Sequence, residues 1–190
     1  MPAVIVVDAR SSVLHNLPKR ANGMEIGVWR GDFSAKILQH AQPKVLHLVD
    51  SWKVQFDAEY ANAWYGAKVT QEVMDGHFQH VTSRFANEIA AGQVKIHRSH
   101  SVDAMAEFRD NSIDFVYVDG DHTFEGALAD LRAALAVVRS GGLICGDDYV
   151  LGGWWKGGVV KALHTFLQEA NVVIEFLVGS QFIVRKIGAA

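Results

Sequence analysis

The sequence is short of cysteine, of basic residues and of long apolar runs. Its single cysteine, Cys145, rules out an internal disulfide and is expected to pack inside a strand. A net charge of −3 argues against the clustered basic surface that nucleic acids require. No apolar run is long enough to cross a bilayer, and no secretory signal is evident. We therefore expect a cytoplasmic protein that binds neither nucleic acid nor membrane.

The totals favour one folded domain over residues 1–190. Hydrophobic residues make up 49% of the 190 residues and charged residues 21%, which is typical of a globular chain with a sizeable core. Residues 1–20 are expected to be a lead-in segment. Within it, Ala3–Val7 could form a strand and Ser11–Leu17 a helical turn that Pro18 breaks. This segment would pack on the domain or on a partner subunit of a homo-oligomer.

The most informative stretch is residues 114–149. An apolar run from Phe115 to Val118 predicts a buried strand, which is followed by a helical pattern that Gly141 and Gly142 end. A second apolar run, Leu143 to Cys145, predicts a parallel strand, so the stretch is a βαβ unit. Acidic residues follow both strands, and both strands end at the same edge of the sheet, where open α/β folds bind ligands. The acidic residues and their histidine are Asp119, Asp121, His122, Asp147 and Asp148.

Grouped carboxylates repel one another unless a cation or a shared proton neutralises them. Asp119, Asp147 and Asp148 suit a hard divalent ion such as Mg²⁺, which prefers oxygen ligands and keeps several waters. His122 beside them is a candidate general base. The alternative is that Asp119 and Asp147 only cap the turns or helices that follow and that His122 is solvated. Acids on two adjacent strand ends favour the functional interpretation.

A second informative stretch, residues 23–34, predicts a strand, a glycine turn and a helix. The strand is Met24–Val28, and the helix runs from Asp32 or Phe33 to His40 with Asp32 as a plausible N-cap. The spacing E-x-G-x-x-x-G, with Gly27 and Gly31, differs from the fingerprint that cradles a pyrophosphate. It suits a ligand with an amino-acid tail, although an ordinary β-to-α turn is equally compatible with it.

Two further strand ends carry candidate ligand contacts. Lys44–Val49 predicts a strand ending in Asp50, 19 residues after Gly31 (50 − 31), where nucleotide-type sites hydrogen-bond a ribose diol. The alternative is that Asp50 is an ordinary acidic residue in a turn. Val94–His97 predicts a third strand, and the residues after it would lie near the base of a nucleoside. They are Ser99, His100 and Ser101, and a helix cap at Ser101 explains them equally well.

Two segments interrupt or close this pattern near the ligand edge. Residues 53–91 are rich in aromatics and predict helices over 57–74 and 78–90, divided by Gly76, as an insertion that could form a lid. Residues 151–158, LGGWWKGG, form a flexible aromatic loop that could close over substrate or pack on the surface.

A helix over 158–170 and two antiparallel strands, 172–178 and 181–187, complete the chain. The expected fold is α/β, Rossmann-like and doubly wound, with a mostly parallel seven-stranded sheet, a reversed last strand and helices on both faces.

From residue 23 to residue 187 the chain resembles the class I S-adenosylmethionine-dependent methyltransferases. EIGVWRG is similar to their first motif, and Asp50 to their ribose-binding acid. VDGDH together with GDDY resembles the metal-dependent O-methyltransferases of the macrocin and catechol types, which share a spacing of 28 positions between the first acid and the acid pair (147 − 119). The short segment before the first motif departs from the antibiotic-sugar enzymes, and this leaves the acceptor open between sugars and other vicinal oxygens.

The resemblance implies a role for each matching residue. The metal, Mg²⁺ or another divalent cation, would be held by Asp119, Asp147 and Asp148, and the base would be Asp121 or His122. The cofactor S-adenosylmethionine would be bound by Glu25, Gly27, Gly31, Asp50, Ser99, His100, Ser101 and Asp119. The implied activity is O-methylation of a small hydroxylated molecule. Two other interpretations are a cofactor-binding module for assembly, which needs no metal acids, and a nucleotide-binding oxidoreductase, which the glycine spacing disfavours.

Overall fold

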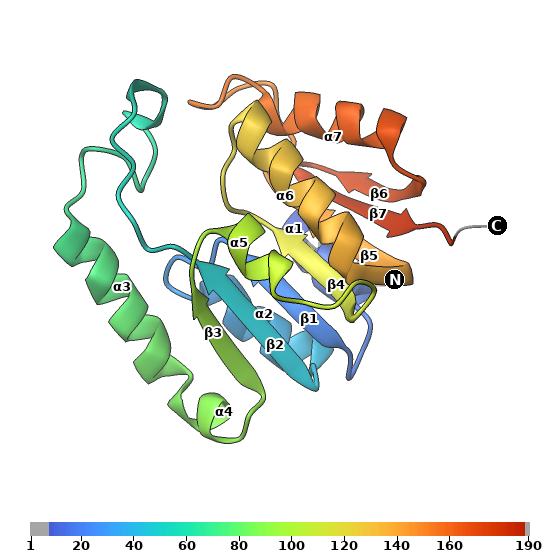
Figure 1. Cartoon of the computed structure of the whole chain (residues 1–190), viewed down its shortest axis with the longest axis horizontal. Coiled ribbons are helices and arrows are strands. Elements are labelled where there is room, and N and C mark those ends of the chain that lie inside the picture. The colour runs from blue at the N-terminus through green and yellow to red at the C-terminus, as the bar shows by residue number, and fades with distance from the viewer. Residues whose placement is uncertain (1–7, 189–190) are drawn as a thin grey trace, which may run out of the picture.

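The computed structural model describes residues 8–188 and contains one seven-stranded sheet flanked by helices (Figure 1). The strands are β1 (Asn22–Ile26), β2 (Val45–Asp50), β3 (Val94–Arg98), β4 (Ile113–Val118), β5 (Val138–Gly146), β6 (Val172–Val178) and β7 (Gln181–Lys186). The helices are α1 (Ala9–Asn16), α2 (Asp32–Ala41), α3 (Gln71–Arg84), α4 (Ala86–Ala90), α5 (Ser101–Ala106), α6 (Phe124–Val137) and α7 (Gly158–Glu169).

The strand order is β3-β2-β1-β4-β5-β7-β6. β7 is antiparallel to both of its neighbours, and the pairs from β3 to β5 are parallel. The predicted doubly wound sheet with a reversed last strand is therefore confirmed. β1 and β4 are adjacent although 86 residues separate Ile26 from Ile113, and the chain winds away from this pair in opposite directions. This switch point is where open α/β sheets bind ligands.

Residues that alternate along the strands build two apolar layers, because successive side chains point to opposite faces of a sheet. Leu46 and Leu48 of β2 pack with α1, α2 and α3 on one face. Val116 and Val118 of β4 pack with α5, α6 and α7 on the other. Figure 1 shows α6 and α7 in front of the sheet and α2 behind it. Helices therefore cover both faces, as predicted.

The glycine pair after α6 does not end a helix as predicted but lies inside β5. α6 already ends at Val137, and β5 begins at Val138 and includes Gly141 and Gly142. The register against β4 shifts here, which is the signature of a bulge, and Gly141 has a φ of 74° that glycine adopts without strain. The prediction places the glycines at the end of the helix, whereas in the structure they form an irregular part of strand β5.

The predicted N-cap of α2 is also corrected. Gly31 occupies the cap position with a left-handed φ of 76°, and Asp32 is the first helical residue. The Asp32 carboxylate instead accepts a hydrogen bond of 2.6 Å from Arg84 Nη1 on α3. At α5 the cap position is held by His100, so Ser101 begins the helix and does not cap it.

The insertion after β2 differs from the prediction in its first half. No helix spans 57–74; a short 3-10 turn (Ala58–Tyr60) and further turns occupy most of that range. α3 begins only at Gln71, because the Thr70 side chain caps it by accepting from the Val73 amide. Gly76 lies within α3 and divides nothing, since its exposed position tolerates a missing side chain at modest cost.

The lead-in segment contains the predicted helical turn. α1 spans Ala9–Asn16, is capped by Asp8, and buries Val13 and Leu14 against the α2 side of the sheet. The predicted strand at Ala3–Val7 lies outside the described residues. Between residues 8 and 188, no helix has the length and apolar character needed to span a bilayer.

Candidate active site

A cavity of about 520 Å³ opens at the carboxyl ends of β1, β2, β4 and β5. This volume lies within the usual range for small-molecule sites. Of the residues predicted to form the site, ten line the cavity: Glu25, Gly27, Asp50, His100, Ser101, Asp119, Asp121, His122, Asp147 and Asp148. Gly31 and Ser99 are not among the lining residues of the described chain. The structure thus brings together side chains from most of the predicted strand ends.

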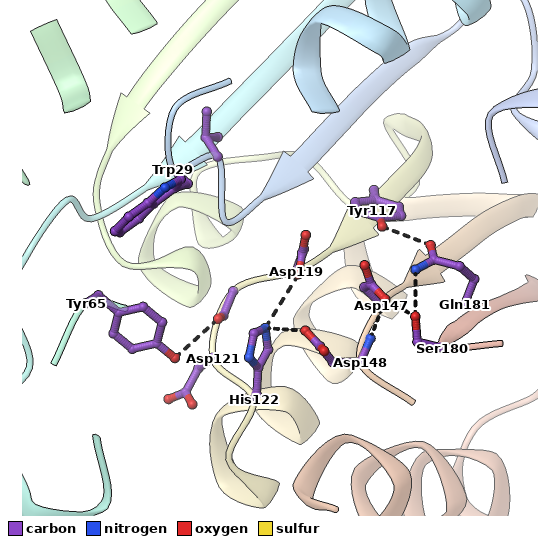
Figure 2. Close-up of polar contacts among 12 residues, drawn as sticks. Trp29, Tyr65, Tyr117, Asp119, Asp121, His122, Asp147, Asp148, Ser180 and Gln181 are labelled. Carbon is purple, nitrogen blue, oxygen red and sulfur yellow. Dashed lines mark hydrogen bonds and ion pairs between the residues drawn. The ribbon is translucent and has the colours of Figure 1, made fainter. Parts of the chain in front are cut away.

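The acidic residues that follow β4 and β5 lie together at one edge of the sheet, which we call the acidic edge. At its centre are Asp119, His122 and Asp148 (Figure 2). Each offers a ligand atom, and these atoms lie within 4.8 Å of one another. His122 Nε2 is 3.2 Å from Asp148 Oδ2 and 3.5 Å from Asp119 Oδ1. Burial alone would lower the pKa of His122, but the two carboxylates outweigh it and the pKa is raised. Burial raises the pKa of Asp148 to about 6 against the opposing effect of His122.

The donor set of this group fits a divalent cation. Two carboxylates and one imidazole supply oxygen and nitrogen ligands of the kind that divalent metals accept. Both ring nitrogens of His122 are buried and make no hydrogen bond with any residue from 8 to 188, although Nε2 lies near two carboxylates. An unpaired buried polar group is costly, so these nitrogens are available to a ligand or a proton.

Asp147 stands apart from this group of three. Its Oδ1 accepts hydrogen bonds from the Asp148 amide at 2.7 Å and from the Ser180 hydroxyl at 2.6 Å. Its Oδ2 lies 3.3 Å from Arg10 Nε. Figure 2 shows the chain of contacts that runs on from Ser180 to Gln181 and Tyr117. The carboxylate is therefore held from one side by the turn that precedes β7 and from the other by the Arg10 guanidinium.

Arg10 of α1 is a site residue that the sequence did not reveal. Its guanidinium forms an ion pair with Asp119 and donates to the Tyr117 hydroxyl at 3.1 Å. Its carbon Cζ lies 4.6 Å from the centre of the Phe33 ring, within cation–π distance. No local motif surrounds Arg10, and only the packing of α1 against the sheet places it beside the acids.

Asp121 and His122 differ in how far their polar atoms are already engaged. Asp121 Oδ2 accepts from the Tyr60 hydroxyl at 2.7 Å, and Oδ1 accepts from the Thr123 amide at 2.9 Å. Gly126 makes room for this arrangement, because a Cβ there would stand 2.3 Å from Asp121 Cγ. Asp121 thus ties the aromatic insertion to the start of α6, whereas the His122 nitrogens make no hydrogen bond within the described chain.

The glycine turn is held by the acid at the end of β2. Asp50 Oδ2 accepts from the amides of Val28 and Trp29 at 3.0 and 2.9 Å, and Oδ1 accepts from Trp52 at 2.7 Å. Burial nevertheless raises the pKa of Asp50 against these three bonds. Gly27, with φ 82°, approaches the Asp119 backbone so closely that a Cβ would lie 1.9 Å from the carbonyl oxygen. The turn therefore needs glycine at this position.

Glu25 is fully buried beneath the turn and accepts a hydrogen bond from the Ser34 hydroxyl. Burial raises its pKa to about 8, so the carboxyl is mostly protonated at neutral pH. The cavity lining therefore includes a neutral carboxyl at Glu25. A neutral carboxyl can both donate and accept a hydrogen bond.

Ser101 lines the cavity, and its hydroxyl donates to Asp130 of α6. Asp130 is 2% exposed, and burial raises its pKa to about 7. Sequence reasoning missed Asp130 because it lies among the apolar residues Ala127, Leu131 and Ala134 at helical spacing. A single acid on an otherwise apolar helical face is the signal that could have identified it.

Aromatic rings from two distant segments meet over His122. The Trp154 ring lies 5.6 Å from Tyr60 and 5.9 Å from Tyr65, measured between ring centres. The Trp155 ring lies edge-on to His122 at 5.1 Å. The first half of the insertion and the glycine-rich loop after β5 therefore form one aromatic wall, while α3 and α4 lie away from it beside β3 (Figure 1).

A family model described as a methyltransferase domain matches residues 24–149. Because this covers more than half of the chain, the protein belongs to that methyltransferase family, and the resemblance to the class I S-adenosylmethionine-dependent enzymes is confirmed. No curated protein matches the chain significantly.

Solved structures share the fold at low identity. The O-methyltransferase TomG of Streptomyces achromogenes, involved in tomaymycin synthesis and solved with S-adenosylmethionine, is 17% identical at TM-score 0.65, over 99% of this chain and 84% of that one. A Bacillus cereus O-methyltransferase solved with S-adenosylhomocysteine is 17% identical at TM-score 0.66, over 97% and 84%. A Clostridium thermocellum structure described as an rRNA methylase is 12% identical at TM-score 0.67, over 98% and 100%.

Proposed function

We propose that this methyltransferase uses S-adenosylmethionine to methylate a hydroxyl of a small molecule, with assistance from a divalent cation. The observation that carries the proposal is the group formed by Asp119, His122 and Asp148 in the lining of the cavity. Asp119 and Asp148 would hold the cation, and Asp147 would complete the carboxylate set. A bound cation lowers the pKa of an oxygen that it contacts, which makes an acceptor hydroxyl a better nucleophile.

His122 is the proposed general base. Its nitrogens have no hydrogen-bond partner among residues 8–188, whereas both oxygens of Asp121 already accept hydrogen bonds. His122 would take the hydroxyl proton as the oxygen attacks the methyl carbon of the sulfonium. Asp121 would position Tyr60 and the loop that carries it. Methyl transfer is an in-line displacement, so the remaining work of the site is to align the two reactants.

The glycine turn and the strand ends around it would bind the cofactor. The neutral Glu25 and the turn at Gly27 line the cavity where the amino-acid tail of the cofactor would lie, and Asp50 lies where a ribose would be held. His100 and Ser101 would lie near the adenine. Tyr65, Trp154 and Trp155 of the aromatic wall line the cavity and would cover the acceptor, whether an aromatic ring or the apolar face of a sugar.

A second candidate is a methyltransferase or cofactor-binding module that works without a metal. One observation favours it: Arg10 already neutralises Asp119 and approaches Asp147, so two of the three predicted metal acids have an internal cation. A nucleic-acid acceptor is less well supported, because a net charge of −3 argues against the broad basic surface that nucleic acids require.

Calorimetry and a transfer assay test the proposal together. S-adenosylmethionine would be titrated into the protein in the presence of Mg²⁺ or Mn²⁺ and again in the presence of EDTA. Radiolabelled methyl transfer would then be measured to catechols, such as 3,4-dihydroxybenzoate, and to sugar diols. We expect cofactor binding, a separate cation-binding signal, and transfer that His122→Ala reduces by about 10²-fold or more. Cofactor binding and transfer that EDTA leaves unchanged would support the metal-independent candidate. Cofactor binding without transfer would favour a binding module.

A further inference from the structure

Arg10 reaches the cavity from α1, which lies before the segment that the family model matches. Three interactions fix its guanidinium: the ion pair with Asp119, the 3.1 Å hydrogen bond to the Tyr117 hydroxyl, and the cation–π contact with Phe33. Because these partners come from β4, its carboxyl end and α2, the cation is positioned before any ligand arrives. Such preorganisation is what a binding group needs to hold a ligand at low entropic cost.

The guanidinium keeps donors that protein partners do not use. Arginine has five N–H donors, and those on Nε and Nη2 make the hydrogen bonds to Tyr117 and Asp119. The Nη1 group donates to none of the residues from 8 to 188. The Arg10 side chain is 36% exposed and lines the cavity, so a ligand in the cavity can contact it.

The charges around Arg10 define the ligand group that it could bind. A ligand group that carries only negative charge would be repelled by the carboxylates of Asp119 and Asp147. The group that binds here must therefore carry a positive charge as well. Glu25 adds no negative charge at neutral pH. The methionine tail of S-adenosylmethionine carries an ammonium and a carboxylate on one carbon. An acid and an arginine in direct contact offer complementary partners for such a pair.

We infer that Arg10 binds the α-carboxylate of the methionine tail of the cofactor, while the Asp119 that it contacts receives the α-ammonium. This assignment rests on the proposed use of S-adenosylmethionine and adds α1 to the cofactor site. Arg10 is always charged, so its role does not depend on pH in the physiological range.

The test compares ligands that differ by one group. S-adenosylmethionine, its decarboxylated form and 5′-methylthioadenosine would be titrated into wild type, Arg10→Gln and Arg10→Lys, all in EDTA to remove cations. Wild type should prefer S-adenosylmethionine to the decarboxylated form by about tenfold to a hundredfold, which is the usual effect of a charge-assisted hydrogen bond. Arg10→Gln should lose that preference, while its affinity for 5′-methylthioadenosine changes by less than about twofold. Arg10→Lys should keep part of the preference.

Other results would overturn the inference in distinguishable ways. If Arg10→Gln weakens all three ligands alike, Arg10 only holds the acids in place. If wild type binds the two forms of the cofactor equally, the carboxylate has no partner at Arg10. This comparison uses wild type alone, so it can be interpreted even if Arg10→Gln does not fold. If wild type binds none of the three, the proposed cofactor itself is wrong. Arg132→Gln, which breaks an exposed ion pair with Glu169, is the matched control and should leave every affinity unchanged.

Discussion

The Ser101 hydroxyl at the start of α5 donates a hydrogen bond to the buried carboxyl of Asp130 in the middle of α6. The second oxygen of Asp130 is buried and has no hydrogen-bond partner among residues 8–188. The contact therefore joins a serine that lines the cavity to an acid whose neighbours on the same face of α6 are apolar. It links the stability of the α5–α6 interface to the protonation of one side chain.

Asp130→Asn should stabilise the protein at pH 8 but much less at pH 5. Burial raises the pKa of Asp130 to about 7 from an ordinary value of 3.8, so the folded state binds a proton that the unfolded state has released. The stability of the wild type therefore falls as the pH rises from about 4 to about 7, whereas a neutral asparagine escapes that loss. Urea unfolding at the two pH values measures the difference. Equal effects of the substitution at both pH values would show that Asp130 does not titrate in this window.

Gly27→Ala should cost at least about 2 kcal/mol of stability and abolish cofactor binding. The backbone there has φ 82°, and the added Cβ would meet the Asp119 carbonyl oxygen at 1.9 Å, so the turn and β4 must separate. Gly76→Ala is the matched control, because nothing lies within 4 Å of the new Cβ on the exposed side of α3. It should raise the free energy of unfolding by about 0.5–1 kcal/mol. Chemical denaturation and S-adenosylhomocysteine titration measure both, and a stable Gly27→Ala that still binds would contradict the prediction.

The fold and the acidic edge could be predicted from the sequence because they depend on local periodicity and on one topological rule. Apolar runs such as Phe115–Val118 identify buried strands, and parallel connections bring strand ends to one edge, which placed Asp119 near Asp148. Arg10 could not be predicted, since its hydrogen-bond partners Tyr117 and Asp119 lie more than 100 residues away and no pattern marks the contact. The prediction starts a helix at residue 57, because the aromatic spacing over 57–70 resembles that of a helix. The structure begins α3 only at Gln71, after the capping residue Thr70.

The pair of histidines on β2 and β3 should make the protein sensitive to acid. His47 Nδ1 lies 2.9 Å from His97 Nε2, and burial together with His97 lowers the pKa of His47 to about 4. The folded state therefore keeps His47 neutral while the unfolded chain protonates near 6.5. Its contribution is present above pH 6.5 and is lost as the pH falls toward about 4.

His47→Gln should flatten this acid limb, because glutamine has no charge to gain. The measurement is the free energy of unfolding between pH 7 and pH 4 for wild type and variant. His80→Gln, at an exposed position on α3, is the control and should follow the wild-type curve. A wild-type curve that is no steeper than that of His47→Gln would rule out the pair as a source of acid sensitivity.

Asp147 and Asp148 should respond differently to substitution if a divalent cation binds at the acidic edge. Asp148 belongs to the group with Asp119 and His122, and its backbone has a left-handed φ of 59°, so its carboxylate is directed by an unusual conformation. Asp148→Asn should weaken Mn²⁺ binding by about tenfold or more, because an anionic ligand is lost. Asp147→Asn should weaken it less, since Ser180 and the Asp148 amide already occupy one oxygen and Arg10 faces the other. Calorimetric titration of Mn²⁺ without cofactor measures both affinities. If Asp147→Asn proves the more damaging, the cation must lie on the Arg10 side of the edge, and Arg10 would then have to move before the metal could bind.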